Sequence, residues 1–193
     1  MTGSVKNDGR RRVSRWRIAP WAIAAFLLLV PLAGVLFTDQ VDWDETDFIV
    51  MGALLFGACG GFELAARMTG NMAYRAAVGV AVVAAFLLIW INLAVGIIGS
   101  EDNPANLMYF GVLAVGLGGA VIARFRPDGM SRALVATALA QGLVAVIALA
   151  FGLGSEGANW PQVIFVIKGF FAALWLASAW LFRKAAREAL PSR

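Results

Sequence analysis

The stretch "GIIGSEDNPANLMYFG" (residues 96–111) joins two long apolar runs, and it contains Glu101 and Asp102 but no basic residue. The chain has 16 Lys and Arg residues, so their absence from this joint calls for an explanation. Loops on the cytoplasmic side of a membrane are enriched in Lys and Arg, whereas loops on the opposite side are not. The stretch therefore predicts a turn on the outer side of a membrane, between two membrane-spanning helices.

The composition of the whole chain supports a membrane protein. Of its 193 residues, 61% are hydrophobic and 15% are charged, whereas soluble domains have about 45–50% apolar and about 25% charged residues. The single cysteine, Cys59, excludes an internal disulfide. The chain has no histidine, which excludes His-based catalysis, His-ligated haem and zinc sites of the HExxH type. We therefore expect no metal site and no cofactor.

Six apolar runs are long enough to cross a bilayer, since each crossing takes about 20 residues. We expect helices, because a backbone in lipid must satisfy its hydrogen bonds within its own segment. The predicted fold is all-α, with a transmembrane domain at residues 18–185, a basic cytoplasmic tail at 1–17 and a short cytoplasmic tail at 186–193. The predicted spans are Ile18–Phe37, Phe48–Ala66, Tyr74–Ile98, Asn106–Ala123, Met130–Leu153 and Val163–Phe182.

The charged residues alternate between the two ends of these spans. All but one of the basic residues precede the first span, flank the second and fourth joints or follow the last span: Lys6, Arg10, Arg11, Arg12, Arg15, Arg17, Arg67, Arg75, Arg124, Arg126, Arg132, Arg183, Lys184, Arg187 and Arg193. The other three joints hold acidic residues: Asp39, Asp42, Asp44, Glu45, Asp47, Glu101, Asp102 and Glu156. This pattern predicts three tandem helical hairpins with both termini cytoplasmic. A secretory signal is the alternative for the basic start, but the first apolar run exceeds the usual length of about 7–15 residues.

Two features suggest a repeat of helix pairs. The joint "GSEDNP" (99–104) is echoed by "GSEGANWP" (154–161), and "MGALLFGACGG" (51–61) aligns without gaps on "FGVLAVGLGGA" (110–120). A duplication explains both features, but any six-span protein with both ends inside also shows the charge alternation.

Small residues lie one helical turn apart in the second and fourth spans, where Gly57 precedes Gly61 and Gly116 precedes Ala120. Such steps let helix backbones approach closely in lipid. We expect them to place these two spans at the centre of the bundle. Homodimerisation is the alternative use of the same faces.

Four polar side chains fall within the predicted spans: Glu63, Asn92, Gln141 and Lys168. Ionisable groups there cost roughly 2.5–3.5 kcal/mol on insertion scales and are candidates for function. Glu63 lies four residues before Arg67, which predicts an ion pair on one helix face; a proton or cation relay is the alternative. For Gln141 we expect a hydrogen bond to another helix.

Lys168 is the one basic residue predicted away from the cytoplasmic side, about 8 Å inside the outer end of the last span. Its long stem predicts that the ammonium reaches outward to acidic loops or headgroups. Asn92 lies at a similar depth, below a group of outer-face polar residues: Glu101, Asp102, Asn103 and Asn106. If Lys168 and Asn92 face each other, they line an outward-facing polar pocket suited to an anion or carboxylate.

The run "NLAVGIIGSEDNPANLMYFGVLAVGLGGAVIARFRPDGMSRAL" (residues 92–134) resembles a block in a family of small multi-span bacterial inner-membrane proteins. The resemblance implies a bacterial inner-membrane location and brings no catalytic or ligand residue. Our first hypothesis is a non-enzymatic structural or accessory subunit in a lipid bilayer, with a second copy or another membrane protein as partner and no nucleic acid. The alternative is a small transporter or channel that uses Lys168 and Asn92.

Overall fold

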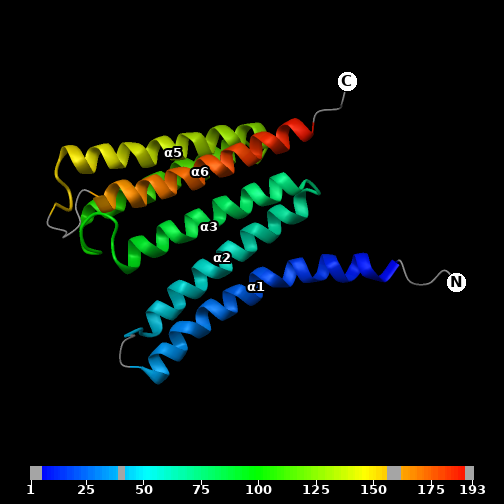
Figure 1. The fold of residues 1–193 in the computed structure, drawn as a ribbon, viewed down its shortest axis with the longest axis horizontal. Coiled ribbons are helices and arrows are strands. Elements are labelled where there is room, and N and C mark those ends of the chain that lie inside the picture. The colour runs from blue at the N-terminus through cyan, green and yellow to red at the C-terminus, as the bar shows by residue number, and fades with distance from the viewer. Residues whose placement is uncertain (1–5, 39–41, 156–161, 190–193) are drawn as a thin grey trace. The chain divides into compact units, whose positions relative to one another are not determined.

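The computed structural model describes residues 6–38, 42–155 and 162–189, and within these ranges every regular element is helical (Figure 1). Each of six helices contains a segment long and apolar enough to cross a membrane, which confirms the predicted all-α, six-span fold. Of the residues discussed above, Asp39, Glu156 and Arg193 lie outside the described ranges. The elements are α1 (Lys6–Phe37), α2 (Glu45–Met68), α3 (Met72–Ala94), the 3-10 helix η1 (Pro104–Leu107), α4 (Met108–Ile122), α5 (Pro127–Ala150) and α6 (Gln162–Glu188).

Several helix ends differ from the predicted spans. α3 ends at Ala94, four residues before the predicted end at Ile98, because the backbone turns at Gly96 with a φ of 68°. Ile98 is nevertheless fully buried in the loop that follows, so the apolar run continues past the end of the helix. At the two chain ends the helices are longer than predicted: α1 already begins at Lys6, and α6 continues to Glu188.

The chain forms two compact units, one up to Leu64 and one from Ala65 onward. In the first unit, α1 remains helical through Pro20 and Pro31 and contacts α2 through Pro20 and Trp21. The Cys59 thiol donates a hydrogen bond to the Pro20 carbonyl (3.4 Å). The ring of Trp21 meets that of Phe56 edge-on, and its Nε1 donates to Glu63 Oε2 (3.2 Å).

The second unit is a bundle of α3, α4, α5 and α6. α5 and α6 lie side by side and have the most extensive mutual packing (Figure 1). α3 packs on α6, and α4 packs on α5, whereas α3 and α4 touch little. The buried face of α6 repeats at spacings of three and four residues, as expected for a helix facing a core, and comprises Lys168, Phe171, Trp175, Ser178 and Phe182. α5 and α6 therefore form the centre of this unit.

The predicted central position of the fourth span is wrong within this bundle. Eight residues of α5 are buried, but only Tyr109, Val112 and Ala120 are buried in α4. α4 does approach α5 through small residues, since a Cβ on Gly116 would lie 3.0 Å from Thr137 Oγ1. The small residues predicted in α4 therefore bring it against one neighbour.

The corresponding glycines of α2 are open. Gly57 and Gly61 are exposed, and a Cβ on either would meet no atom within 4 Å. The buried residues of α2 are instead Met51, Leu55 and Cys59. Within the described residues of the first unit, the predicted packing face of α2 therefore makes no close helix contact.

Large apolar side chains cover the outward faces of the helices. Exposed fractions reach 85% for Ile122, 70% for Leu139 and 70% for Ile49. Extended apolar surfaces of this kind mark contact with a membrane or a partner rather than with water. Together with the six apolar spans, they define a multi-pass integral membrane protein embedded in a lipid bilayer.

Candidate functional site

One end of the four-helix bundle, here called the Asn106 end, is organised by a single buried amide. Asn106 Oδ1 accepts hydrogen bonds from the backbone N–H groups of Ile97 (3.0 Å) and Ile98 (2.9 Å). Its Nδ2 donates to the carbonyls of Ser100 (2.7 Å) and Ile98 (3.5 Å). Asn106 thereby satisfies backbone groups of a loop that has no regular secondary structure and of which Ile97 and Ile98 are buried.

The other three predicted outer-face residues belong to the same loop. Asn103 caps η1, because its Oδ1 accepts from the N–H of Ala105 (3.0 Å). Glu101 and Asp102 are exposed. The loop itself therefore accounts for Asn103 and Asn106 as structural residues.

Asn92 lies directly beneath this loop. Its side chain is 5% exposed, and Nδ2 donates to the Asn106 carbonyl (3.3 Å). Its Oδ1 has no hydrogen-bond partner among the described residues. One helical turn after Asn106, the buried hydroxyl of Tyr109 also lacks a partner in the described part of the chain.

Lys168 projects into the bundle and not outward, so the predicted extension of its ammonium to the surface is wrong. The residue is 4% exposed because it shares the α6 face of Phe171 and Trp175, which packs into the bundle. Its Nζ donates to the Val144 carbonyl of α5 (3.3 Å) and lies 5.7 Å from the centre of the Tyr109 ring. An ammonium has three N–H donors, so this environment leaves donor capacity unused.

Gln141 and Trp175 add to the same interior. Gln141 is fully buried one turn before Val144 on α5, yet neither its Nε2 nor its Oε1 has a partner within the described ranges. The interhelical hydrogen bond of Gln141 is not found among the described residues and stays a prediction. Trp175, two turns after Lys168 on α6, is 2% exposed, and its Nε1 also lacks a partner there.

All four helices of the bundle thus contribute polar groups with unused hydrogen-bonding capacity. We call this set the interior polar cluster: Asn92, Tyr109, Gln141, Lys168 and Trp175. The structure brings Asn92 and Lys168 to the same end of the bundle, but it connects them through Asn106 of η1 and Tyr109 of α4. The outward-facing pocket predicted between them stays a prediction.

Two residues that sequence reasoning missed continue this polar interior. Ser178 Oγ donates to the Ala77 carbonyl (2.7 Å), and Thr137 Oγ1 donates to the Ala133 carbonyl (2.9 Å); both side chains are fully buried. Ser178 lies on the α6 face of Lys168, and Thr137 lies four residues before Gln141. Both residues could have been identified from the sequence, because each lies at a helical spacing from a polar residue that was already a candidate, Thr137 from Gln141 and Ser178 from Lys168.

Glu63 lies in the first unit, apart from this cluster in the sequence. Its carboxylate accepts the hydrogen bond from Trp21 described above, which accounts for one oxygen of this intramembrane acid. Its pairing with Arg67 stays a prediction.

Comparisons of the chain with protein families, with curated proteins and with solved structures found no match. The findings therefore define the class, a multi-span helical membrane protein, and identify no family. Membership in the small bacterial inner-membrane family stays a prediction.

Proposed function

We propose that the protein is a non-enzymatic small transporter or channel, whose α3–α6 bundle binds a small anion or carboxylate at Lys168. The observation that carries the proposal is the buried Lys168 ammonium, which has a single side-chain hydrogen bond among the described residues, to a backbone carbonyl. Ionisable residues inside a membrane bundle are functional candidates by default, because burying them is costly.

The chemistry of the surrounding groups favours an anion. The Tyr109 hydroxyl, the Gln141 amide and the Trp175 indole N–H are all donors without a protein partner in the described residues. Two acceptors are unused as well, Asn92 Oδ1 and Gln141 Oε1. Buried polar groups are normally hydrogen-bonded, and groups without protein partners point to bound water or an ion. An excess of unpartnered donors in the same bundle as a buried cation matches a carboxylate or a halide.

A flux measurement tests this proposal. Purified protein in liposomes would be assayed for uptake of chloride, acetate and succinate. We expect uptake of at least one of them, reduced about tenfold or more in Lys168→Met, since a hydrogen bond to a charged group contributes about 1.5–3 kcal/mol. Lys184→Met is the matched control, because Lys184 is exposed. Wild-type flux in Lys168→Met, or no flux of any of the three anions, would contradict the proposal.

The second candidate function is that of a structural or accessory subunit of a membrane assembly. The observation that favours it is the face of α2 at Gly57 and Gly61, which no atom of the first unit covers. Crosslinking in native membranes tests it. A partner protein or second copy that crosslinks through position 57 supports this function, and a monomer alone argues against it.

For the location we propose a bacterial inner membrane with both termini in the cytoplasm. In support, the described arginines of the second unit follow α4 or lie within two turns of the end of α2, the start of α3, the start of α5 or the end of α6: Arg67, Arg75, Arg124, Arg126, Arg132, Arg183 and Arg187. Glu101 and Asp102 lie in the loop at the other end of α3, as the positive-inside rule requires of an outward-facing loop.

A further inference from the structure

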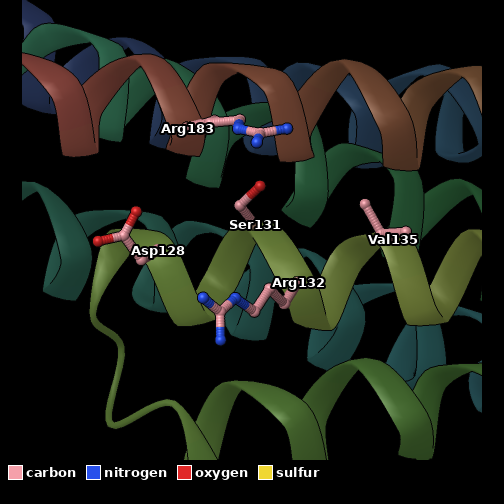
Figure 2. A pocket seen from close by; sticks show the side chains of 5 residues that line it. All are labelled: Asp128, Ser131, Arg132, Val135 and Arg183. Carbon is pink, nitrogen blue, oxygen red and sulfur yellow. The ribbon is translucent and has the colours of Figure 1, made fainter.

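The arginine-bearing end of the bundle contains a cavity of about 280 Å³ between α5 and α6, lined by Asp128, Ser131, Arg132, Val135 and Arg183 (Figure 2). We propose that this cavity binds the headgroup of a monoanionic phospholipid whose phosphodiester carries free hydroxyl groups, as in phosphatidylglycerol. None of the residues that line this cavity belongs to the interior polar cluster. The inference therefore does not depend on the proposed transport function.

The two arginines supply the phosphate-binding chemistry. Arg132 comes from α5 and Arg183 from α6, and Figure 2 shows the Ser131 hydroxyl directed toward α6. Neither guanidinium has a hydrogen-bond or ion-pair partner in the described part of the chain. Arginine binds phosphate oxygens through two parallel N–H bonds, and basic pockets between transmembrane helices bind lipid headgroups. Arg183 and Ser131 therefore face the same part of the cavity, whereas the Arg132 guanidinium is directed away from α6 and would have to turn toward them to share one phosphate (Figure 2).

Asp128 narrows the choice of headgroup. Two guanidiniums and one carboxylate leave this cavity with a net charge of +1, which complements a single negative charge. An ionised carboxylate only accepts hydrogen bonds, so Asp128 favours a headgroup that offers hydroxyl donors beyond its phosphate. A glycerol headgroup meets both conditions, and a choline headgroup, which has no N–H or O–H donor, does not.

The apolar side of the cavity favours a lipid over a soluble phosphate. Val135 lines the cavity, and Leu139 and Leu143 continue from it at intervals of four residues along the exposed face of α5, with 70% and 60% of their side chains exposed. This stripe covers roughly 12 Å of helix length, which can hold part of an acyl chain. On α6, one turn before Arg183, Trp180 is exposed, as is common at a membrane interface.

The experiment measures lipid binding to the purified full chain in dodecylmaltoside by native mass spectrometry. Phosphatidylglycerol and phosphatidylcholine are the two probes. We expect wild-type protein to prefer phosphatidylglycerol, and Arg132→Ala/Arg183→Ala to lose about tenfold or more of that affinity, since charge-assisted hydrogen bonds are the strong ones. The control, Arg126→Ala/Arg187→Ala, removes the same charge from exposed residues that do not line the cavity. We expect it to retain wild-type affinity.

Three outcomes would overturn the proposal. Equal losses in the two double variants would show attraction to surface charge alone. Equal binding of phosphatidylcholine would show no headgroup recognition. Competition by glycerol 3-phosphate at concentrations equal to the lipid would make a soluble phosphate the ligand.

A further variant, Asp128→Asn, tests the lipid preference without disturbing the fold. Asp128 is exposed, so Asp128→Asn should leave the unfolding midpoint unchanged. We expect it to shift the preference from phosphatidylglycerol toward phosphatidic acid, which lacks the glycerol hydroxyls and carries more charge. An unchanged preference would contradict the role of Asp128.

Discussion

At the scale of single residues, the buried polar side chains of the second unit fall into two groups. Asn106, Thr137 and Ser178 are hydrogen-bonded to backbone groups, and the Ser178 bond links α6 to α3. Tyr109 and Gln141 have no such partners among the described residues, so nothing in the fold accounts for their polarity. The sequence predicted Gln141 as buried and polar, but hydrogen-bond satisfaction depends on which helix faces it, and that is set by tertiary packing.

Replacing Asn106 with Leu removes both acceptor and donor from the loop after α3. The N–H groups of Ile97 and Ile98 then remain buried without a partner. We expect a loss of about 2–4 kcal/mol in the free energy of unfolding, since each unsatisfied buried group costs about 1–3 kcal/mol. Unfolding in detergent mixtures measures it. Asn103→Ala, which removes only the cap of η1, should cost about 1 kcal/mol, and an equal loss in both variants would contradict the central role of Asn106.

Replacing Gln141 with Leu has the opposite expected effect on stability. Both amide atoms are buried without a partner in the described residues, and burying an unpaired amide costs about 1–3 kcal/mol by protein mutational data. We expect the variant to be more stable by about 1–2 kcal/mol and its anion flux to fall. The same unfolding and uptake assays measure both changes. A destabilised variant would show that the amide has found partners, such as ordered water, that Leu cannot replace.

At the scale of elements, the two similar "GSE" joints lie against each other. Gly99 and Gly154 have φ angles of 73° and 79°, and a Cβ on Gly154 would lie 2.6 Å from the Gly99 backbone nitrogen. The helix pairs and the similarity between these two joints were both evident from the sequence. It could not predict that α3 packs on α6 and not on α4, because spacing within one helix does not say which neighbour covers its face.

Gly154→Ala should therefore destabilise the protein. The substitution strains a backbone with positive φ, at a cost of about 1–3 kcal/mol, and it forces the loops after α3 and α5 apart. Gly142→Ala is the matched control, since Gly142 lies in α5 and a Cβ there meets no atom within 4 Å. We expect the control to gain about 0.5–1 kcal/mol from reduced backbone freedom. Comparable unfolding midpoints for the two variants would show that the loop contact is unimportant.

At the scale of the whole molecule, the number of helices and their class could be predicted from hydropathy and charge. The six apolar runs gave the spans to within a few residues, except where Gly96 ended α3 early and polar residues extended α1 and α6. The division after Leu64 and the central role of α5 and α6 could not be predicted, because both depend on packing between helices. The cavity at Arg132 and Arg183 could not be predicted either, because its two arginines lie 51 positions apart in the sequence and are brought together only by the packing of α5 and α6.

The central claim is that alternate loops lie on opposite sides of a membrane. Cysteine accessibility in a Cys59→Ala background tests it directly, because Cys59 is the only cysteine. Glu101→Cys and Ser155→Cys report on one side, and Gly70→Cys and Arg126→Cys report on the other. We predict that a membrane-impermeant maleimide applied to intact cells labels positions 101 and 155, and labels 70 and 126 only after permeabilisation. Labelling of 101 and 70, or of 155 and 126, from the same side would contradict the account.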